Sequence, residues 1–212
     1  MLSNIYLPKN ARQIFIDGPV GTLDSLEFKP FTENIILGIA IICHPDPKGG
    51  GTYNNKIVQT LAKILNNNGY LCICPNLRGV GQSDGEHDYG VGEVDDLHAI
   101  HNYLRNIYPK LPLILAGFSL GAAIVSQLAS QVPHKKLILI APAVTRLDVL
   151  NPDITNTIVI HGEKDDVVPV DKVLEWSKIK DQPIVLVPNT CHFFHGKLML
   201  LQQILNAYNF KD

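Results

Sequence analysis

The segment 111–131, LPLILAGFSLGAAIVSQLASQ, constrains the fold of this chain more than any other part of the sequence. An apolar run that ends at Ala116 meets the pentapeptide GFSLG and passes directly into an alanine-rich stretch with helical periodicity. We therefore predict a buried strand, a tight turn and a helix, with Ser119 at the tip of the turn. Gly117 and Gly121 suit this turn, because a Cβ at either place would collide with it.

Such a turn gives Ser119 an unusual chemical position. Its hydroxyl is lifted clear of both elements and stands at a helix N-terminus, where unpaired N–H groups and the positive dipole end favour a developing anion. The pattern G-x-S-x-G is short and also arises by chance. It becomes informative when a buried strand precedes it, a helix follows it, and an acid and then a histidine come later in the chain.

The composition narrows the class of protein. A chain of 212 residues suits one domain spanning 1–212, and 46% hydrophobic residues is ordinary for a soluble α/β protein. A formal net charge of −2, without any basic run, argues against nucleic acid as a partner. No apolar run reaches about 18 residues and the first 16 residues do not resemble a signal peptide, so we expect no membrane association and a cytoplasmic location.

Strand and helix patterns alternate from residue 35 onward. This alternation predicts an α/β fold with a mostly parallel central sheet and helices on both faces. Before it, residues 13–16 and 23–28 form an antiparallel hairpin pattern around the Gly/Pro-rich segment 17–21. The later strands are expected at 35–43, 70–74, 111–116, 137–141, 157–160 and 184–187, and the helices at 57–65, 94–107, after 119, at 170–179 and at 198–208. For the helix at 57–65, Thr52 or Asn54 is the expected N-cap and Gly69 the expected stop.

The four cysteines give no sign of a metal site. Cys43, Cys72 and Cys74 lie in apolar strand-like runs, where cysteine behaves as a small hydrophobe, and Cys191 adjoins a histidine. Cys72 and Cys74 would share one face of a strand at a spacing that is awkward for a disulfide or a zinc ion. We expect no metal and no cofactor.

Loops that leave the carboxyl ends of parallel strands form the sites of such sheets. The loop after Ile160 carries acids and the loop after Val187 carries a histidine, so Ser, Asp and His follow one another in chain order. A serine hydroxyl needs a base within hydrogen-bond reach, and that base needs a carboxylate to hold its tautomer. We assign Ser119 as nucleophile, His192 as base and later acid, and Asp165 as the orienting carboxylate.

Two of these roles have competitors. Asp166 adjoins Asp165 and is open to the same role, and whichever of the two is unused is expected to cap the helix that begins near residue 170. His195 lies three residues beyond His192 and competes with it, although a packing or capping role suits His195 better.

Four further histidines are interpreted as structural or as lying outside the site. His44 and His161 each close a buried strand, and both are expected to brace loops through hydrogen bonds. His98 and His101 lie on a helix away from the carboxyl ends of the strands, where no role in the site is expected.

Acyl transfer also requires donors for the oxyanion. The residue after the nucleophile supplies one, the N–H of Leu120. The second should come from the loop after Cys43, where the prolines on either side of Asp46 have no N–H, so the N–H of Asp46 is available. The glycines at 49–51 remain alternatives.

These motifs resemble the α/β-hydrolase fold family, and the match covers nearly the whole chain. GFSLG at 117–121 is similar to the nucleophile elbow, HGEKDDVVP at 161–169 to the acid loop, and CHFF at 191–194 to the histidine loop. The segments 44–56 and 76–96 resemble a small bacterial subgroup of uncharacterised hydrolases that lack a lid.

The resemblance carries further implications for individual residues. It places the acid on Asp165 and the base on His192. Arg78 belongs to a loop that is similar to the one after the family's fourth strand, where it acts as a structural brace or as a substrate ligand. Only residues 144–156 stand where other members insert a cap domain, and thirteen residues are too few for one, so we expect an open site.

We therefore expect a serine hydrolase of the carboxylesterase type that cleaves short-chain carboxylic esters or thioesters through an acyl-enzyme. The expected partner is a small-molecule ester or thioester, or an exposed acyl group, and the protein is expected to be a monomer or homodimer. A peptidase or amidase using the same triad is one alternative, and a catalytically silent binding or scaffold protein is another. Dienelactone-type hydrolysis is disfavoured because that branch uses cysteine where this chain has Ser119.

Overall fold

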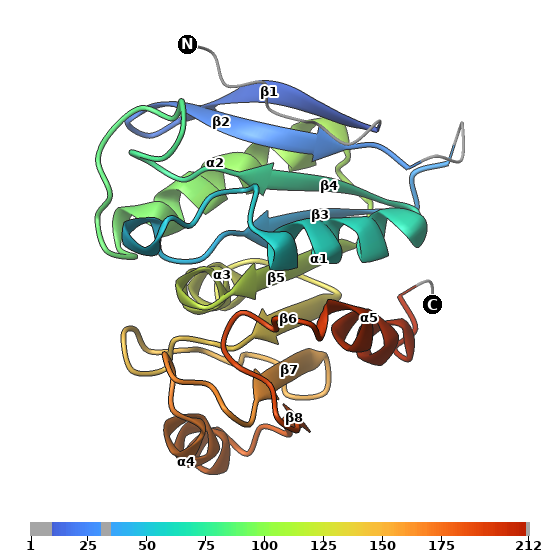
Figure 1. Cartoon of the computed structure of the whole chain (residues 1–212). Helices are drawn as coiled ribbons and strands as arrows, with labels where there is room; N and C mark the ends of the chain where they lie inside the picture. The colour runs from blue at the N-terminus through green and yellow to red at the C-terminus, as the bar shows by residue number, and fades with distance from the viewer. Residues whose placement is uncertain (1–9, 31–34, 211–212) are drawn as a thin grey trace.

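The computed structural model describes residues 10–30 and 35–210, which build one eight-stranded sheet with helices on both faces (Figure 1). The strand order is β1-β2-β4-β3-β5-β6-β7-β8. The strands are β1 (Ala11–Gly18), β2 (Gly21–Phe28), β3 (Gly38–Cys43), β4 (Tyr70–Pro75), β5 (Leu113–Phe118), β6 (Lys136–Ile140), β7 (Thr157–Gly162) and β8 (Val185–Val187).

The predicted sheet is confirmed, with differences at the strand ends. β1 and β2 form the antiparallel hairpin at one edge, β2 pairs antiparallel with β4, and every pair from β4 to β8 is parallel. The hairpin is longer than predicted, because its ladder continues to Gly18 opposite Gly21. β3 is shorter than predicted, since Ile35 is 66% exposed and pairing with β4 begins only at Gly38.

Five helices cover the sheet within the described residues. They are α1 (Lys56–Asn67), α2 (Gly92–Ile107), α3 (Leu120–Ala129), α4 (Val170–Lys180) and α5 (Leu198–Asn206), with a short 3-10 turn, η1 (Pro47–Gly49), before α1. α1 and α5 cover one face, and α2, α3 and α4 pack on the other (Figure 1). None of these helices is both long enough and apolar enough to cross a lipid bilayer.

The two faces of the central strands explain their continuous apolar sequence. Along β3, Ile39 and Ile41 pack toward α2 and α3, whereas Ala40 and Ile42 pack toward α1. A strand buried on both faces has no place for a solvent-facing residue, so the alternation seen in half-exposed strands is lost.

Cys72 and Cys74 lie on the face of β4 that α1 covers, as free thiols. Burial raises the pKa of both thiols well above the usual range. Both cysteines are therefore unreactive packing groups.

The start of α1 differs from the prediction, while its end does not. Asn55 is the N-cap, and its Oδ1 accepts the Ile57 N–H at 2.9 Å. The expected caps, Thr52 and Asn54, instead form the preceding turn, where Thr52 Oγ1 accepts the Asn54 N–H. Gly69, with φ +88°, follows the C-cap Asn68 and terminates the helix as predicted.

The fold places the loops that follow the parallel strands β3 to β8 at one edge of the sheet. Between β6 and β7, residues 141–156 form no helix and no strand. A cap domain is therefore absent from the place where the family resemblance would put one, and the pocket described below lies uncovered by such a domain.

Candidate active site

Ser119 occupies the turn between β5 and α3 in a strained backbone conformation. Its φ is +56° and its ψ is −119°, which is rare for a residue with a side chain. β6 and the loop after it stabilise the turn: the Ser119 N–H donates to the Ile140 carbonyl at 2.9 Å, and the Ala143 N–H donates to the Ser119 carbonyl at 3.2 Å. β6 and the loop after it therefore keep Ser119 in the strained conformation that presents its hydroxyl to the pocket.

The flanking glycines are required by close backbone approaches. A Cβ on Gly117 would lie 2.4 Å from the Gly121 carbonyl oxygen, within the turn as predicted. A Cβ on Gly121 would lie 2.2 Å from the carbonyl oxygen of His44, which follows β3. The second glycine therefore allows α3 to approach the end of the neighbouring strand, a contact that the turn alone does not reveal.

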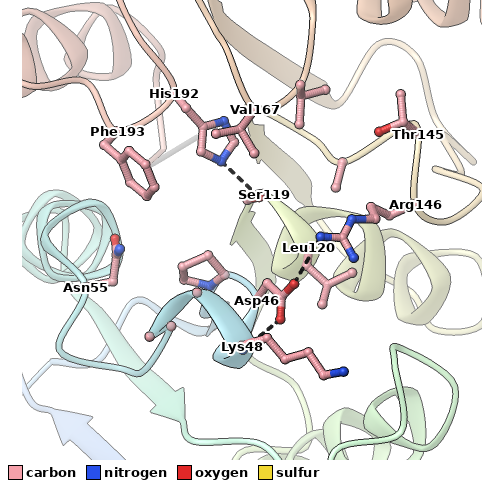
Figure 2. A pocket seen from close by; sticks show the side chains of 16 residues that line it. Asp46, Lys48, Asn55, Ser119, Leu120, Thr145, Arg146, Val167, His192 and Phe193 are labelled. Carbon is pink, nitrogen blue, oxygen red and sulfur yellow. Dashed lines mark hydrogen bonds and ion pairs between the residues drawn. The ribbon is translucent and has the colours of Figure 1, made fainter.

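The predicted serine, histidine and acid are brought together in a chain of hydrogen bonds. His192 Nε2 lies 3.0 Å from Ser119 Oγ, and His192 Nδ1 lies 2.7 Å from Asp165 Oδ2 (Figure 2). Because a carboxylate can only accept, Nδ1 carries the proton and Nε2 is the acceptor for the serine hydroxyl. All three side chains are buried, from loops that follow β5, β7 and β8.

Asp165 is held as a carboxylate by four groups. Its Oδ1 accepts the N–H of Val167 at 2.9 Å and that of Val168 at 2.7 Å. Burial acts to raise the pKa of Asp165, but the bonds to His192 and Val168 and the charges of His192 and His161 outweigh it, so the pKa lies below its ordinary value. Asp165 is therefore ionised at neutral pH.

Asp166 does not take either role considered for it. Its side chain is exposed, and the contact with His192 belongs to Asp165. The expectation that the unused acid caps α4 is wrong, because Pro169 occupies the N-cap and no side chain caps that end.

A pocket of about 410 Å³ opens beside Ser119 and His192. Apolar side chains line much of it, and its other ionisable groups are Asp46, Lys48 and Arg146 (Figure 2). Throughout residues 10–30 and 35–210, no group of three or more His, Cys, Asp or Glu side chains is placed to hold a metal ion.

The chain matches the alpha/beta hydrolase fold family over residues 41–153. It is 36% identical to a serine hydrolase without a lid from Xanthomonas campestris, with a TM-score of 0.87 over 95% of this chain and 94% of that one. The chain belongs to the α/β-hydrolase fold family. Its predicted resemblance to lidless members is thereby confirmed.

Two further relatives of this α/β hydrolase come from other bacteria. An uncharacterised protein of Rickettsia prowazekii is 31% identical over 210 residues, covering 92% of this chain and 87% of that one. A monoacylglycerol lipase of Mycolicibacterium smegmatis is 25% identical over 167 residues, covering 76% of this chain and 58% of the lipase.

The loop after β3 presents a restricted set of N–H groups to the pocket of this hydrolase. The N–H groups of Gly49 and Gly51 both donate to the Asp46 carbonyl, and that of Gly50 donates to the Pro47 carbonyl. Among the described residues, no backbone carbonyl accepts the N–H groups of Asp46 and Leu120. Both residues line the pocket beside Ser119.

His161 contacts the carboxylate of Asp165, which was not predicted from the sequence. Its ring is fully buried, its Nε2 donates to the Val168 carbonyl at 3.0 Å, and the same atom lies 3.5 Å from Asp165 Oδ2. Burial lowers the pKa of His161, against the raising effects of Asp165 and Val168. His161 therefore braces the acid loop as expected, and it also contacts the carboxylate. In the sequence, only the spacing of four residues between His161 and Asp165 pointed to this contact.

His44 joins two loops at the edge of the sheet. Its Nδ1 donates to the Pro45 carbonyl at 2.6 Å, and its Nε2 accepts the Leu77 N–H at 3.1 Å. Burial lowers the pKa of His44 to about 4. The neutral ring is thus a brace between the loops after β3 and β4, as predicted.

The other candidate histidines stand outside this constellation. His195 stacks against Phe193 with ring centroids 5.7 Å apart. On α2, His98 Nε2 contacts Gln131, which follows α3, and His101 contacts its neighbour Asn102.

Arg78 is a structural brace. Its guanidinium donates hydrogen bonds to the buried carboxylate of Asp96, with Nη2 2.7 Å from Oδ1. The backbone N–H of Arg78 donates to the same carboxylate at 2.9 Å. Since Arg78 is itself largely buried and does not line the pocket, the alternative role as a substrate ligand is not supported.

Proposed function

We propose that this α/β hydrolase cleaves short-chain carboxylic esters or thioesters through an acyl-enzyme. The observation that carries the proposal is the hydrogen-bonded chain from Asp165 through His192 to Ser119 at the wall of an open pocket. In this proposal Ser119 is the nucleophile, His192 the base and later the acid, and Asp165 the orienting carboxylate.

In the first half of the reaction, Ser119 Oγ attacks the substrate carbonyl carbon while its proton passes to His192 Nε2. The Asp165 carboxylate stabilises the imidazolium that forms. The N–H groups of Leu120 and Asp46 donate hydrogen bonds to the negative oxygen. When the tetrahedral intermediate collapses, the bond to the leaving oxygen or sulfur breaks and His192 returns the proton to it. An acyl ester on Ser119 remains.

In the second half, water attacks the acyl ester and gives its proton to His192 Nε2. The bond to Ser119 Oγ then breaks, and His192 protonates that oxygen. The products are a carboxylic acid and an alcohol or thiol. Every proton is accounted for by Ser119, His192 and water.

One feature supports a short substrate and a second supports an ester. The pocket is about 410 Å³ and has no cap domain above it that would shelter a long acyl chain from water. In addition, one relative of 25% identity is a monoacylglycerol lipase, an enzyme that acts on esters.

Stopped-flow hydrolysis of 4-nitrophenyl butyrate tests the proposal. The wild-type protein should release a burst of 4-nitrophenolate equal to the enzyme concentration, followed by slower turnover. Ser119→Ala and His192→Ala should each lower kcat by at least about a thousandfold. Wild-type protein that is folded, yet no faster than Ser119→Ala, would refute the proposal and favour a silent binding protein.

A further inference from the structure

The side chains that line the pocket have a formal net charge of opposite sign to that of the whole chain. Apart from His192, the ionisable lining residues are the anion Asp46 and the cations Lys48 and Arg146. Their formal sum is one positive charge, from two cations and one anion, whereas the whole chain carries a formal net charge of −2. The side chains that line the pocket therefore carry one cation in excess, with the ionised Asp165 lying behind His192.

Arg146 reaches the pocket from the loop after β6. Its Nη2 lies 3.4 Å from Asp46 Oδ2, which is a long contact, and its side chain is 63% exposed. The Asp46 carboxylate is also engaged by the Lys48 N–H, which donates to Oδ1 at 2.9 Å. Asp46 therefore only partly satisfies Arg146, and guanidinium donors remain for another acceptor.

Lys48 also lines the pocket, and its ammonium is held without being neutralised. Its Nζ lies 2.7 Å from Tyr89 Oη and 4.2 Å from the centre of that ring. Among the residues that the structure describes, no carboxylate pairs with Lys48. Contact with a neutral ring orients the ammonium and leaves its charge available.

Among the described residues, the opposite side of the pocket carries Phe193 and Asn55 and no charged side chain (Figure 2). Figure 2 shows Phe193 on one side of Ser119 and Arg146 on the other. Phe193 is 43% exposed, and its ring edge packs on His192 with centroids 5.1 Å apart. The nucleophile thus lies between the Phe193 ring and the side of the pocket that carries Arg146 (Figure 2).

From this arrangement we infer, on the basis of the proposed function, that the preferred substrates are esters or thioesters that bear a carboxylate. Arg146 and Lys48 would bind this carboxylate while Ser119 attacks the ester carbonyl. A carboxylate complements the excess cation among the lining side chains. The planar fork of arginine and the mobile ammonium of lysine both suit a carboxylate.

A competing explanation is that Arg146 only braces the loop that carries Asp46. Matched substrates separate the two roles. 4-Nitrophenyl hydrogen adipate and 4-nitrophenyl hexanoate share an acyl chain of the same length, but only the first ends in a carboxylate. 4-Acetoxybenzoate and its methyl ester differ in the same way on the leaving group.

The measured quantity is the ratio of kcat/KM for the anionic substrate to kcat/KM for its neutral partner. In the wild type this ratio should exceed one for at least one pair and should fall as salt is added. Arg146→Gln and Lys48→Gln should each lower it by roughly threefold to tenfold, mainly through KM. Lys110→Gln removes an exposed cation near the amino end of β5, away from the pocket, and should leave the ratio unchanged.

The outcomes also distinguish the inference from the function beneath it. A bracing role for Arg146 would lower kcat for both members of a pair and leave their ratio unchanged, which overturns the inference. Wild-type turnover of the neutral esters that depends on Ser119, without preference for the anion, likewise overturns the inference and leaves the proposed function standing. Absence of Ser119-dependent turnover for every ester overturns both.

Discussion

At the scale of single residues, the candidate site depends on a few atoms that are held by the backbone. The strained φ of Ser119 presents its Oγ to the pocket, and the bond from His192 Nδ1 to Asp165 leaves Nε2 free to take a proton. The N–H groups of Val167 and Val168 fix the carboxylate in turn. Small changes in one side chain are therefore expected to have large effects on rate.

The two adjacent acids give the first prediction. Asp165→Asn should lower kcat by about a thousandfold or more, because an amide in this place does not hold the required imidazole tautomer. Asp166→Asn changes an exposed neighbour and should keep nearly full activity. Steady-state hydrolysis of 4-nitrophenyl butyrate compares them. Equal losses in both variants would contradict the assignment.

His44 gives a prediction on stability against pH. Its pKa falls from an ordinary 6.5 to about 4 on folding, so as pH falls the unfolded chain takes up a proton first. This stabilising contribution is complete above pH 6.5 and is lost between pH 6.5 and 4, by at most about 3 kcal/mol in the free energy of unfolding.

His161 acts in the same direction, so wild type must be compared with a variant. In urea unfolding at several pH values, His44→Gln should be less stable at pH 7 but lose less stability on acidification. An unchanged pH dependence in the variant would show that His44 does not remain neutral in the folded protein.

At the scale of elements, the site depends on how closely α3 approaches β3. The missing side chain of Gly121 lets the helix begin beside the His44 carbonyl, and the same approach puts the Leu120 N–H at the pocket. The elbow is therefore a contact between two elements as well as a tight turn.

A methyl group at this contact should be costly. Gly121→Ala places a Cβ 2.2 Å from a backbone oxygen, so it should lower the free energy of unfolding by about 1–3 kcal/mol and reduce ester hydrolysis further by moving Ser119. Gly49→Ala is the matched control for stability, because a Cβ there meets nothing within 4 Å. Thermal unfolding and activity measure both. Similar stability of the two variants would contradict the close approach.

At the scale of the whole molecule, the candidate triad is assembled from three strand ends. Ser119 follows β5, Asp165 follows β7, and His192 follows β8, so their geometry requires this part of the sheet to be intact. Trp176 on α4 packs beside these strands and donates its indole N–H to the Val149 carbonyl at 2.9 Å. Its environment therefore reports on the docking of α4 and of the loop after β6.

This arrangement predicts coincident unfolding. Trp176 is the only tryptophan, so its fluorescence in increasing urea follows one defined place. Loss of ester hydrolysis should have the same midpoint as the change in fluorescence, because a single cooperative sheet holds both. Activity that disappears at clearly lower urea, while the fluorescence is still native, would mean that the site loops open independently of the sheet.

Much of the fold could be predicted, because local patterns report it directly. Continuous apolar runs marked the strands buried on both faces, and GFSLG with the later acid and histidine indicated which loops meet. The start of β3 was misplaced because Ile35 is as apolar as the residues of the strand, and burial is decided by tertiary packing. Because adjacent acids look alike in sequence, Asp166 remained a competitor of Asp165, and the family resemblance agreed with the assignment of Asp165.

Features that depend on distant contacts could not be predicted. Arg146 and Asp46 stand 100 residues apart in sequence and meet only because the loops after β3 and β6 share one edge of the sheet. The clash of a Cβ on Gly121 with the His44 carbonyl also could not be predicted from the sequence. The charge around the pocket thus emerged only in three dimensions.

The central claim is that Ser119 is a nucleophile activated by His192. Labelling with a fluorophosphonate, followed by intact-protein mass spectrometry and peptide mapping, tests it most directly. We predict one adduct per chain on Ser119 in the wild type, none in Ser119→Ala, and strongly slowed labelling in His192→Ala. Folded wild-type protein that stays unlabelled, or that is labelled elsewhere, would contradict the account.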